Sequence, residues 1–153
     1  MVNKRITDFQ APFQSTSKRI LGMMNRKYFD AKTVSSFMKT LRKENTRVVC
    51  RTDMIVGWPT ETEQERQDSL EFAADNFDEV AVYSIEFNKD LPAWKYVDKQ
   101  FSKTEIDKIQ KDCKEYLFKR GKMAHAGQQE DETALALEAN RIKLRESKKA
   151  QAN

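Results

Sequence analysis

The chain has 153 residues, which is about the length of one domain. Its hydrophobic content of 39% is low and its charged content of 34% is high, so a modest core and many solvated helices are expected. No apolar run reaches the roughly 18 residues of a membrane-spanning helix. The first residues also lack the apolar segment of a secretory signal. A cytoplasmic protein without a membrane partner is therefore expected.

Charge is distributed unevenly along the chain, although the net charge is only +4. Residues 1–60 carry a charge of +8, residues 61–98 carry −8 and residues 99–153 carry +4. A basic N-terminal region is compatible with binding to nucleic acid. It is equally compatible with packing against an acidic segment of this chain or of another one. The sequence leaves both interpretations open.

The first predicted element is a short strand over residues 5–14, which ends in a loop because Pro12 cannot donate to a ladder. Ser15 or Ser17 can cap a following helix that runs to about Asn25. The next elements alternate between helical periodicity and β-branched or apolar runs. They are a helix over 31–44 capped by Asp30, a strand over 47–57, a helix over 63–76 that opens with a Thr62/Glu65 capping box, and a strand over 78–87.

The character of the chain changes after this last strand. Ser102 and Glu105 form a second capping box, at the start of a helix that ends near Gly121. Residues 125–129 are predicted as a break. The final stretch, residues 130–149, is rich in Ala, Glu and Lys and is predicted as a helix with a thin apolar stripe.

Strands that alternate with helices of this length imply parallel pairing. The predicted fold class is therefore α/β, a partial parallel (βα) barrel of about three strands with a C-terminal helical extension. Residues 1–97 hold the strands, and residues 98–153 form the helical tail. Three strands cannot close a barrel, so an open sheet edge is expected. Such an edge is a template for pairing with another chain.

Two motifs carry a resemblance to a known family. The first is the run PFQSTS at residues 12–17, followed by MMNRKY at residues 23–28, and the second is TDMIVGWPTET at residues 52–62. They resemble two consecutive strand-and-loop units from the second half of a radical S-adenosylmethionine (SAM) barrel. The match is best with the methylthiotransferase branch, which carries P-x-Q-S-G-S…M-x-R-x-Y and then T-D-x-I-x-G-F-P-G-E-T. Residues 1–97 are accordingly predicted as the later strands of such a barrel.

The resemblance implies that the first motif binds SAM. The Gln14 amide would hydrogen-bond the ribose hydroxyls, and Ser15 would add a hydroxyl contact. Arg26 would clasp the carboxylate of the cofactor in its bidentate fork. The alternative is structural: Gln14 then satisfies backbone groups of its loop, and Arg26 pairs with a carboxylate such as Asp30.

The second motif is implied to complete that site. An Asp inside an apolar strand is costly to bury unless it is paired or functional, and the resemblance implies that Asp53 reaches the ribose of SAM. Backbone groups from Ile55 to Gly57 would contact the adenine edge, because Gly57 has no Cβ to hold a flat ligand away. A tight strand-to-helix turn with a good cap is the alternative, and both can hold together.

Departures from the family pattern set limits on this resemblance. Thr16 and Thr60 stand where the family has Gly, Trp58 where it has Phe, and Glu86 where an Arg is usual, which puts the substrate chemistry of the family in doubt. The C-x3-C-x2-C loop that holds a 4Fe-4S cluster is absent. The chain has two cysteines and one histidine, whereas an SAM-activating cluster needs three thiolates. No metal ligand and no catalytic residue is therefore expected in this chain.

Three hypotheses follow. In the first, the chain is the C-terminal portion of a methylthiotransferase-like enzyme. It supplies the SAM contacts, is inactive alone, and depends on a missing segment or a partner N-terminal half that carries the cysteine motif. Its substrate would be RNA, as in tRNA modification, or protein. In the second, it is a catalytically silent interaction module derived from the barrel. In the third, it is a small basic nucleic-acid-binding protein.

Overall fold

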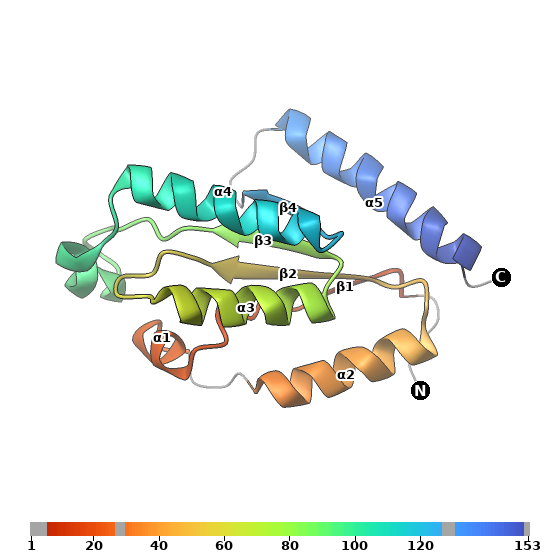
Figure 1. Cartoon of the computed structure of the whole chain (residues 1–153), viewed down its shortest axis with the longest axis horizontal. Coiled ribbons are helices and arrows are strands. Elements are labelled where there is room, and N and C mark those ends of the chain that lie inside the picture. The colour runs from red at the N-terminus through yellow and green to blue at the C-terminus, as the bar shows by residue number, and fades with distance from the viewer. Residues whose placement is uncertain (1–5, 27–29, 127–130, 152–153) are drawn as a thin grey trace.

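A computed structural model describes residues 6–26, 30–126 and 131–151 (Figure 1). Four strands form one open sheet in the order β1-β2-β3-β4, and every neighbouring pair is parallel. The elements in chain order are β1 (Asp8–Gln10), α1 (Lys18–Met23), α2 (Ala31–Glu44), β2 (Val49–Ile55), α3 (Glu63–Asn76), β3 (Glu79–Tyr83), the 3-10 helix η1 (Pro92–Lys99), α4 (Lys103–Lys119), β4 (Met123–Ala126) and α5 (Asp131–Gln151).

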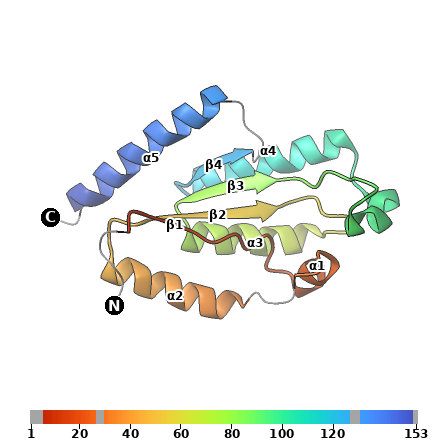
Figure 2. The ribbon, with the colours of Figure 1, turned by 180° about the vertical axis from the view of Figure 1, so that it is seen from behind.

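The sheet is covered differently on its two faces. Helices α3 and α4 lie in front of the strands in Figure 1 and behind them in Figure 2, and together with α2 they cover the outer face. The apolar core lies on this side and includes Met54, Val80 and Leu117. The opposite, inner face carries the half-buried Arg51, Asp53 and Ile55 of β2. Helix α5 runs past the starts of the strands (Figure 2), where its arginines reach Glu79 and Asp8.

Most predicted elements are confirmed. The helices over 31–44 and 63–76 have the predicted bounds, and the capping boxes at Thr62 and Ser102 are both formed. Ser17 caps α1. The first and third strands are shorter than predicted, although Gln14 extends the first by an isolated parallel bridge to Met54.

The fourth strand was not predicted. Residues 125–129 were expected to form a break, but His125 and Ala126 belong to β4, while residues 127–129 lie outside the described part. The run Met123–Ala126 has no β-branched residue, so its local propensity does not favour a strand. Pairing with β3, which is buried except at its last residue, makes this run a strand. The open α/β sheet is thus confirmed, with four strands in place of about three, and the region after residue 97 contributes one of them.

Internal ion pairs account for much of the charge asymmetry. Acidic residues of the segment 61–98 bind basic residues from both flanking regions: Arg19 pairs with Glu65, Arg42 and Lys148 with Asp78, and Arg141 with Glu79. The interpretation of complementary packing therefore holds for these residues. In the described part of the chain, no helix is long and apolar enough to span a membrane.

Candidate functional site

The C-terminal ends of β1, β2 and β3, with the loops that follow them, are called the rim here. The backbone of Gln14 is hydrogen-bonded to the end of β2, at the rim. Its backbone N–H donates to the carbonyl oxygen of Asp53 at 3.0 Å, and its own carbonyl oxygen accepts from Ile55 N–H at 2.9 Å. The structure thus brings together Gln14, Asp53 and Ile55, three of the residues that the resemblance assigned to the cofactor.

Gln14 has an unusual backbone conformation and an unusual side-chain environment. Its φ of 69° lies in the left-handed region, which a non-glycine residue adopts only where its surroundings over-determine it. Its side chain is almost wholly buried, with the residue 8% exposed, and Oε1 has no hydrogen-bond partner among the described residues. Buried polar atoms are nearly always paired. An unpaired amide oxygen at this position can accept a hydrogen bond from a ligand hydroxyl.

Ser15 is already engaged inside the protein. It is 1% exposed, and its hydroxyl lies 3.4 Å from that of Ser69 on α3 and accepts from the backbone N–H of Ser17 at 3.2 Å. Ser69 also accepts from the backbone N–H of Thr16 at 3.0 Å. This serine cluster fastens the turn after Gln14 to α3. The geometry gives Ser15 a role in holding Gln14.

Asp53 lies on the inner face with two neighbours that sequence reasoning missed. The Gln10 side-chain amide donates to its carboxylate at 3.2 and 3.4 Å from the neighbouring strand. Tyr83 occupies the last position of β3, and burial, with a smaller effect of the Asp53 charge, raises the pKa of its phenol. The two-residue alternation of β2 places Arg51, Asp53 and Ile55 on one face of the sheet. It could have shown which face Asp53 lies on, but not which residues of the neighbouring strands lie beside it.

Arg26 follows α1 and is exposed. Its backbone N–H donates to the carbonyl of Leu21 at 2.8 Å. Its guanidinium has no hydrogen-bond or ion-pair partner in the described ranges, so the alternative pairing with Asp30 is not formed there. Asp30 instead caps α2 by accepting from the Lys32 backbone N–H. Arg26 is therefore available for a ligand, whereas the structure shows no contact between it and Gln14 or Asp53.

Gly57 is required by the packing of the protein itself. Its φ is +67°, and a Cβ at this position would lie 2.3 Å from Cδ1 of Ile106 on α4. Its backbone N–H donates to the buried carboxylate of Glu61 at 2.8 Å, and Arg66 donates to the same oxygen at 3.2 Å. Burial raises the pKa of Glu61, and these two bonds oppose that effect. The Glu61 carboxylate thus holds the β2–α3 loop together through these two hydrogen bonds.

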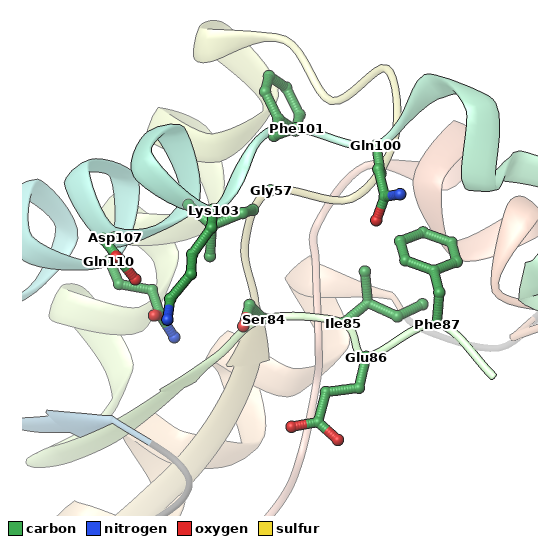
Figure 3. A pocket seen from close by; sticks show the side chains of 11 residues that line it. Gly57, Ser84, Ile85, Glu86, Phe87, Gln100, Phe101, Lys103, Asp107 and Gln110 are labelled. Atoms are coloured by element: carbon green, nitrogen blue, oxygen red, sulfur yellow. The ribbon is translucent and has the colours of Figure 1, made fainter.

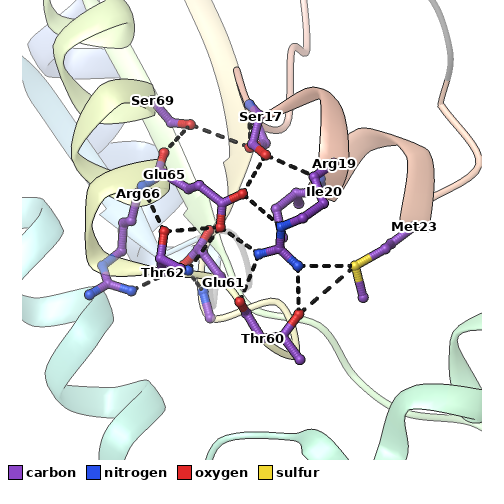
Figure 4. Close-up of polar contacts among 12 residues, drawn as sticks. Ser17, Arg19, Ile20, Met23, Thr60, Glu61, Thr62, Glu65, Arg66 and Ser69 are labelled. Carbon is purple, nitrogen blue, oxygen red and sulfur yellow. Dashed lines mark hydrogen bonds and ion pairs between the residues drawn. The ribbon is translucent and has the colours of Figure 1, made fainter.

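A polar clamp joins α1 to this loop (Figure 4). Arg19 donates to both carboxylate oxygens of Glu65, at 3.0 and 2.6 Å, and to the backbone oxygen of Thr60 at 2.8 Å. Thr60 has a left-handed φ of 68°. Hydrogen bonds from Arg19, together with those from Thr62 and Ser17 and against the effect of burial, lower the pKa of Glu65 to about 2. This clamp was not predicted from the sequence, because Thr60 and Glu65 are more than 40 residues from Arg19.

A cavity of about 420 Å³ opens beside the rim, between the loop after β3 and the start of α4 (Figure 3). Its volume is in the usual range for small-molecule sites, about 300–1,000 Å³. Gly57 lines it, alone among the residues assigned from the resemblance. The other lining residues are Ser84, Ile85, Glu86, Phe87, Gln100, Phe101, Lys103, Ile106, Asp107 and Gln110.

The described residues contain no group of three or more His, Cys, Asp or Glu side chains that could hold a metal ion. Cys50 and Cys113 are free and buried. Burial raises the pKa of Cys50 to about 11 and that of Cys113 to about 12. Both thiols therefore stay protonated at neutral pH and are poor metal ligands.

The relatives found by sequence comparison are uS12 methylthiotransferases and tRNA-2-methylthio-N(6)-dimethylallyladenosine synthases. No family model matches the chain. The chain is 32% identical over 104 residues to the ribosomal protein uS12 methylthiotransferase RimO of Alkaliphilus oremlandii, which covers 67% of this chain and 24% of that protein. It is 36% identical over 88 residues to a tRNA-2-methylthio-N(6)-dimethylallyladenosine synthase of the same organism, covering 57% and 18%. A RimO of Clostridium botulinum is 30% identical over 113 residues. The chain spans about a quarter of the length of these curated relatives or less.

Proposed function

The chain belongs to the methylthiotransferase branch of the radical SAM family, in the part that it shares with its relatives, and we propose that this part holds SAM. Gln14 binds the ribose, Arg26 the carboxylate, and Asp53 the ribose from the β2 side. Backbone groups from Ile55 to Gly57 meet the adenine edge. The chain thus acts as the C-terminal portion of a methylthiotransferase-like enzyme, in the cytoplasm.

Gln14 carries this proposal. An amide oxygen that is buried and unpaired accepts a hydrogen bond from a ligand hydroxyl at little cost, because its desolvation has already occurred on folding. The left-handed backbone at Gln14 is held by two bonds to β2 and by the serine cluster behind it. Ser15 belongs to that support. The site is therefore largely preformed, and Arg26 is the one assigned side chain that has to be positioned by the cofactor.

The iron–sulfur cluster does not fit the residues of this chain. The chain has two cysteines, both buried, where a cluster with an open iron needs three thiolates. We therefore assign the cluster to another segment or to a partner N-terminal half with the cysteine motif. In a complete enzyme the cluster supplies the electron that cleaves SAM. The residues described here orient the cofactor, and this chain alone is expected to be inactive.

The names of the relatives point to the class of substrate. One group acts on ribosomal protein uS12, and the other is named for a tRNA nucleoside. An RNA or protein substrate is proposed on that basis. Glu86, which replaces the usual Arg, lines the cavity beside the rim and is the residue at which substrate choice would differ.

A catalytically silent module is the second candidate. One observation favours it: α5 covers part of the inner face, which in an enzyme of this family would point into the barrel. The third candidate, nucleic-acid binding by the basic N-terminal region, has less support, because Arg19 and Arg42 are already paired with carboxylates.

Isothermal titration calorimetry with SAM tests the proposal, using this chain alone and mixed with the N-terminal part of the A. oremlandii uS12 methylthiotransferase. The informative variant is Gln14→Gly, which removes the amide and keeps the left-handed backbone. Gln14→Gly and Arg26→Ala should each weaken binding by about 1.5–3 kcal/mol, or roughly 10- to 150-fold. Lys18→Ala, an exposed position on α1, is the matched control. Unchanged affinity in Gln14→Gly would refute the assignment.

A further inference from the structure

Helix α5 carries a row of cations that meets a row of acids at the starts of the strands. Arg141, Arg145 and Lys148 are spaced by four and three residues, so they share one side of the helix. Arg145 donates to Asp8 at 2.6 Å, and Lys148 donates to Asp78 at 2.8 Å and to the backbone oxygen of Val48 at 3.1 Å. The starts of β1, β2 and β3 are thereby joined to one helix.

The strongest contact in this row is at Glu79, the first residue of β3. Glu79 is 2% exposed, and Arg141 donates to both of its carboxylate oxygens, at 2.7 and 2.5 Å. His125 of β4 lies 3.0 Å from the same carboxylate. Burial raises the pKa of Glu79, but the bonds from Arg141 and His125 outweigh burial and lower the pKa to about 2. The carboxylate is therefore charged at neutral pH and depends on α5 for its main partner.

The described side chains of α5 reach the sheet through ion pairs and hydrogen bonds. None of its described residues belongs to the apolar core, whereas α2, α3 and α4 all supply core residues. Its Ile142 is 46% exposed. A helix that is held by ion pairs, and whose described residues lie outside the core, can detach while the rest of the fold persists, because local opening costs only the contacts that are lost.

We propose that α5 is a releasable strap over the base of the inner face, and that it gives way to the strands that complete the barrel. The second part of this statement rests on the proposed function. The interior of a closed parallel barrel of about eight strands is filled by the side chains of those strands. A helix whose arginines reach Asp8 and Glu79 occupies that space. The strap and a completed barrel therefore exclude each other.

The histidine of this chain is a native reporter of the strap, because His125 shares the Glu79 carboxylate with Arg141 and the sequence has one histidine. The test variant is Arg141→Gln/Arg145→Gln. Its control is Lys143→Gln/Lys149→Gln, which removes the same charge from exposed positions of α5. NMR should show a changed His125 ring signal, and α5 amides that exchange at least about tenfold faster, in the test variant alone. The amides of β2 and β3 should stay protected.

Two results would overturn the strap. One is cooperative loss of the whole fold in the test variant, which would make α5 an integral part of the structure. The other is equal behaviour of the test and control variants. Hydrogen exchange of the unmodified chain gives an independent check that needs no variant. The α5 amides should open at a lower free energy than those of β2, and equal values would contradict the proposal.

The exclusion of a completed barrel has its own measurement. Adding the N-terminal part of the A. oremlandii uS12 methylthiotransferase should move the His125 signal of this chain to its position in the test variant. Binding of that part with the His125 signal unchanged would show that strap and barrel coexist. Neither result depends on SAM, so a failure of the strap and a failure of the cofactor assignment remain distinguishable.

Discussion

The two ends of the parallel strands are built on different physical principles. At the rim, the backbone is held in unusual conformations: Gln14, Gly57 and Thr60 all have φ near +68°. At the base, where the strands begin, the backbone is regular and the stabilising contacts are ion pairs between α5 and carboxylates such as Glu79. The structure of the rim is determined mainly by backbone conformation and steric fit, whereas the base is held by ion pairs.

This difference assigns a role to each end. Strained backbone positions persist where the surrounding structure holds a functional arrangement in place, and the left-handed Gln14 and Thr60 are at the rim. The carboxylates of the base all have partners: Asp8, Asp78 and Glu79 are each bonded to a cation of α5. In parallel barrels the C-terminal ends of the strands carry function and the N-terminal ends carry stability. This open sheet keeps that division.

The largest expected effect is at the rim. In Gly57→Ala, the new Cβ meets Ile106 Cδ1 and the left-handed φ becomes unfavourable. Overpacking and backbone strain together should lower the free energy of unfolding by about 3 kcal/mol, measured by urea denaturation. Adding Ile106→Val removes only the clashing Cδ1 and should recover the steric part, leaving about 1 kcal/mol of strain. A single variant as stable as the parent chain would show that the rim tolerates changes of shape.

The sequence predicts the elements of this fold better than it predicts their contacts. The Thr62/Glu65 and Ser102/Glu105 boxes locate two helix starts, because a cap is a local interaction. β4 escaped prediction because its strand character comes from pairing with β3. Short-range patterns cannot reveal interactions of this kind.

In the candidate site, too, local motifs were predictable and contacts between distant segments were not. Gln14 and Asp53 were selected by motif, and the structure places them side by side through the Gln14–Met54 bridge. The role of Gly57 could not be foreseen in full, because the atom that demands a glycine belongs to Ile106, 49 residues later in the chain. Arg19 was likewise missed, since its partner Glu65 is brought near only by the folding of α1 against α3.

Low pH should lower the free energy of unfolding through one carboxylate at each end of the strands. Glu65 at the rim and Glu79 at the base both have a pKa of about 2, lowered from 4.5. Each therefore contributes stability that is fully present above pH 4.5 and is lost as the pH falls toward 2, by about 2 kcal/mol per group. Urea denaturation between pH 5 and about pH 2.5 should show this loss.

The matched variants Glu65→Gln and Glu79→Gln should each flatten part of the acid profile, but with different consequences. Loss of the Glu65 charge weakens the clamp on the rim and should lower global stability. Loss of the Glu79 charge should act mainly on the His125 signal and on α5 exchange, because no described residue of α5 belongs to the core. Identical profiles for the two variants would remove the distinction between a rim held by shape and a base held by charge.

The smallest expected effect concerns the exposed ion pair of the rim, between Arg19 and Glu65. Arg19 is 47% exposed at its side chain, yet it bonds Glu65 and holds the left-handed Thr60 through the backbone oxygen. Exposed ion pairs contribute little, but here one guanidinium makes several bonds and restrains a strained residue. Arg19→Ala should therefore cost about 1 kcal/mol in urea denaturation. Arg26→Ala, without a side-chain partner in the described ranges, should cost almost nothing. If Arg19→Ala is equally silent, the loop conformation at Thr60 is set by the Glu61 carboxylate and the Thr62 cap, and the rim does not need the exposed Arg19–Glu65 pair.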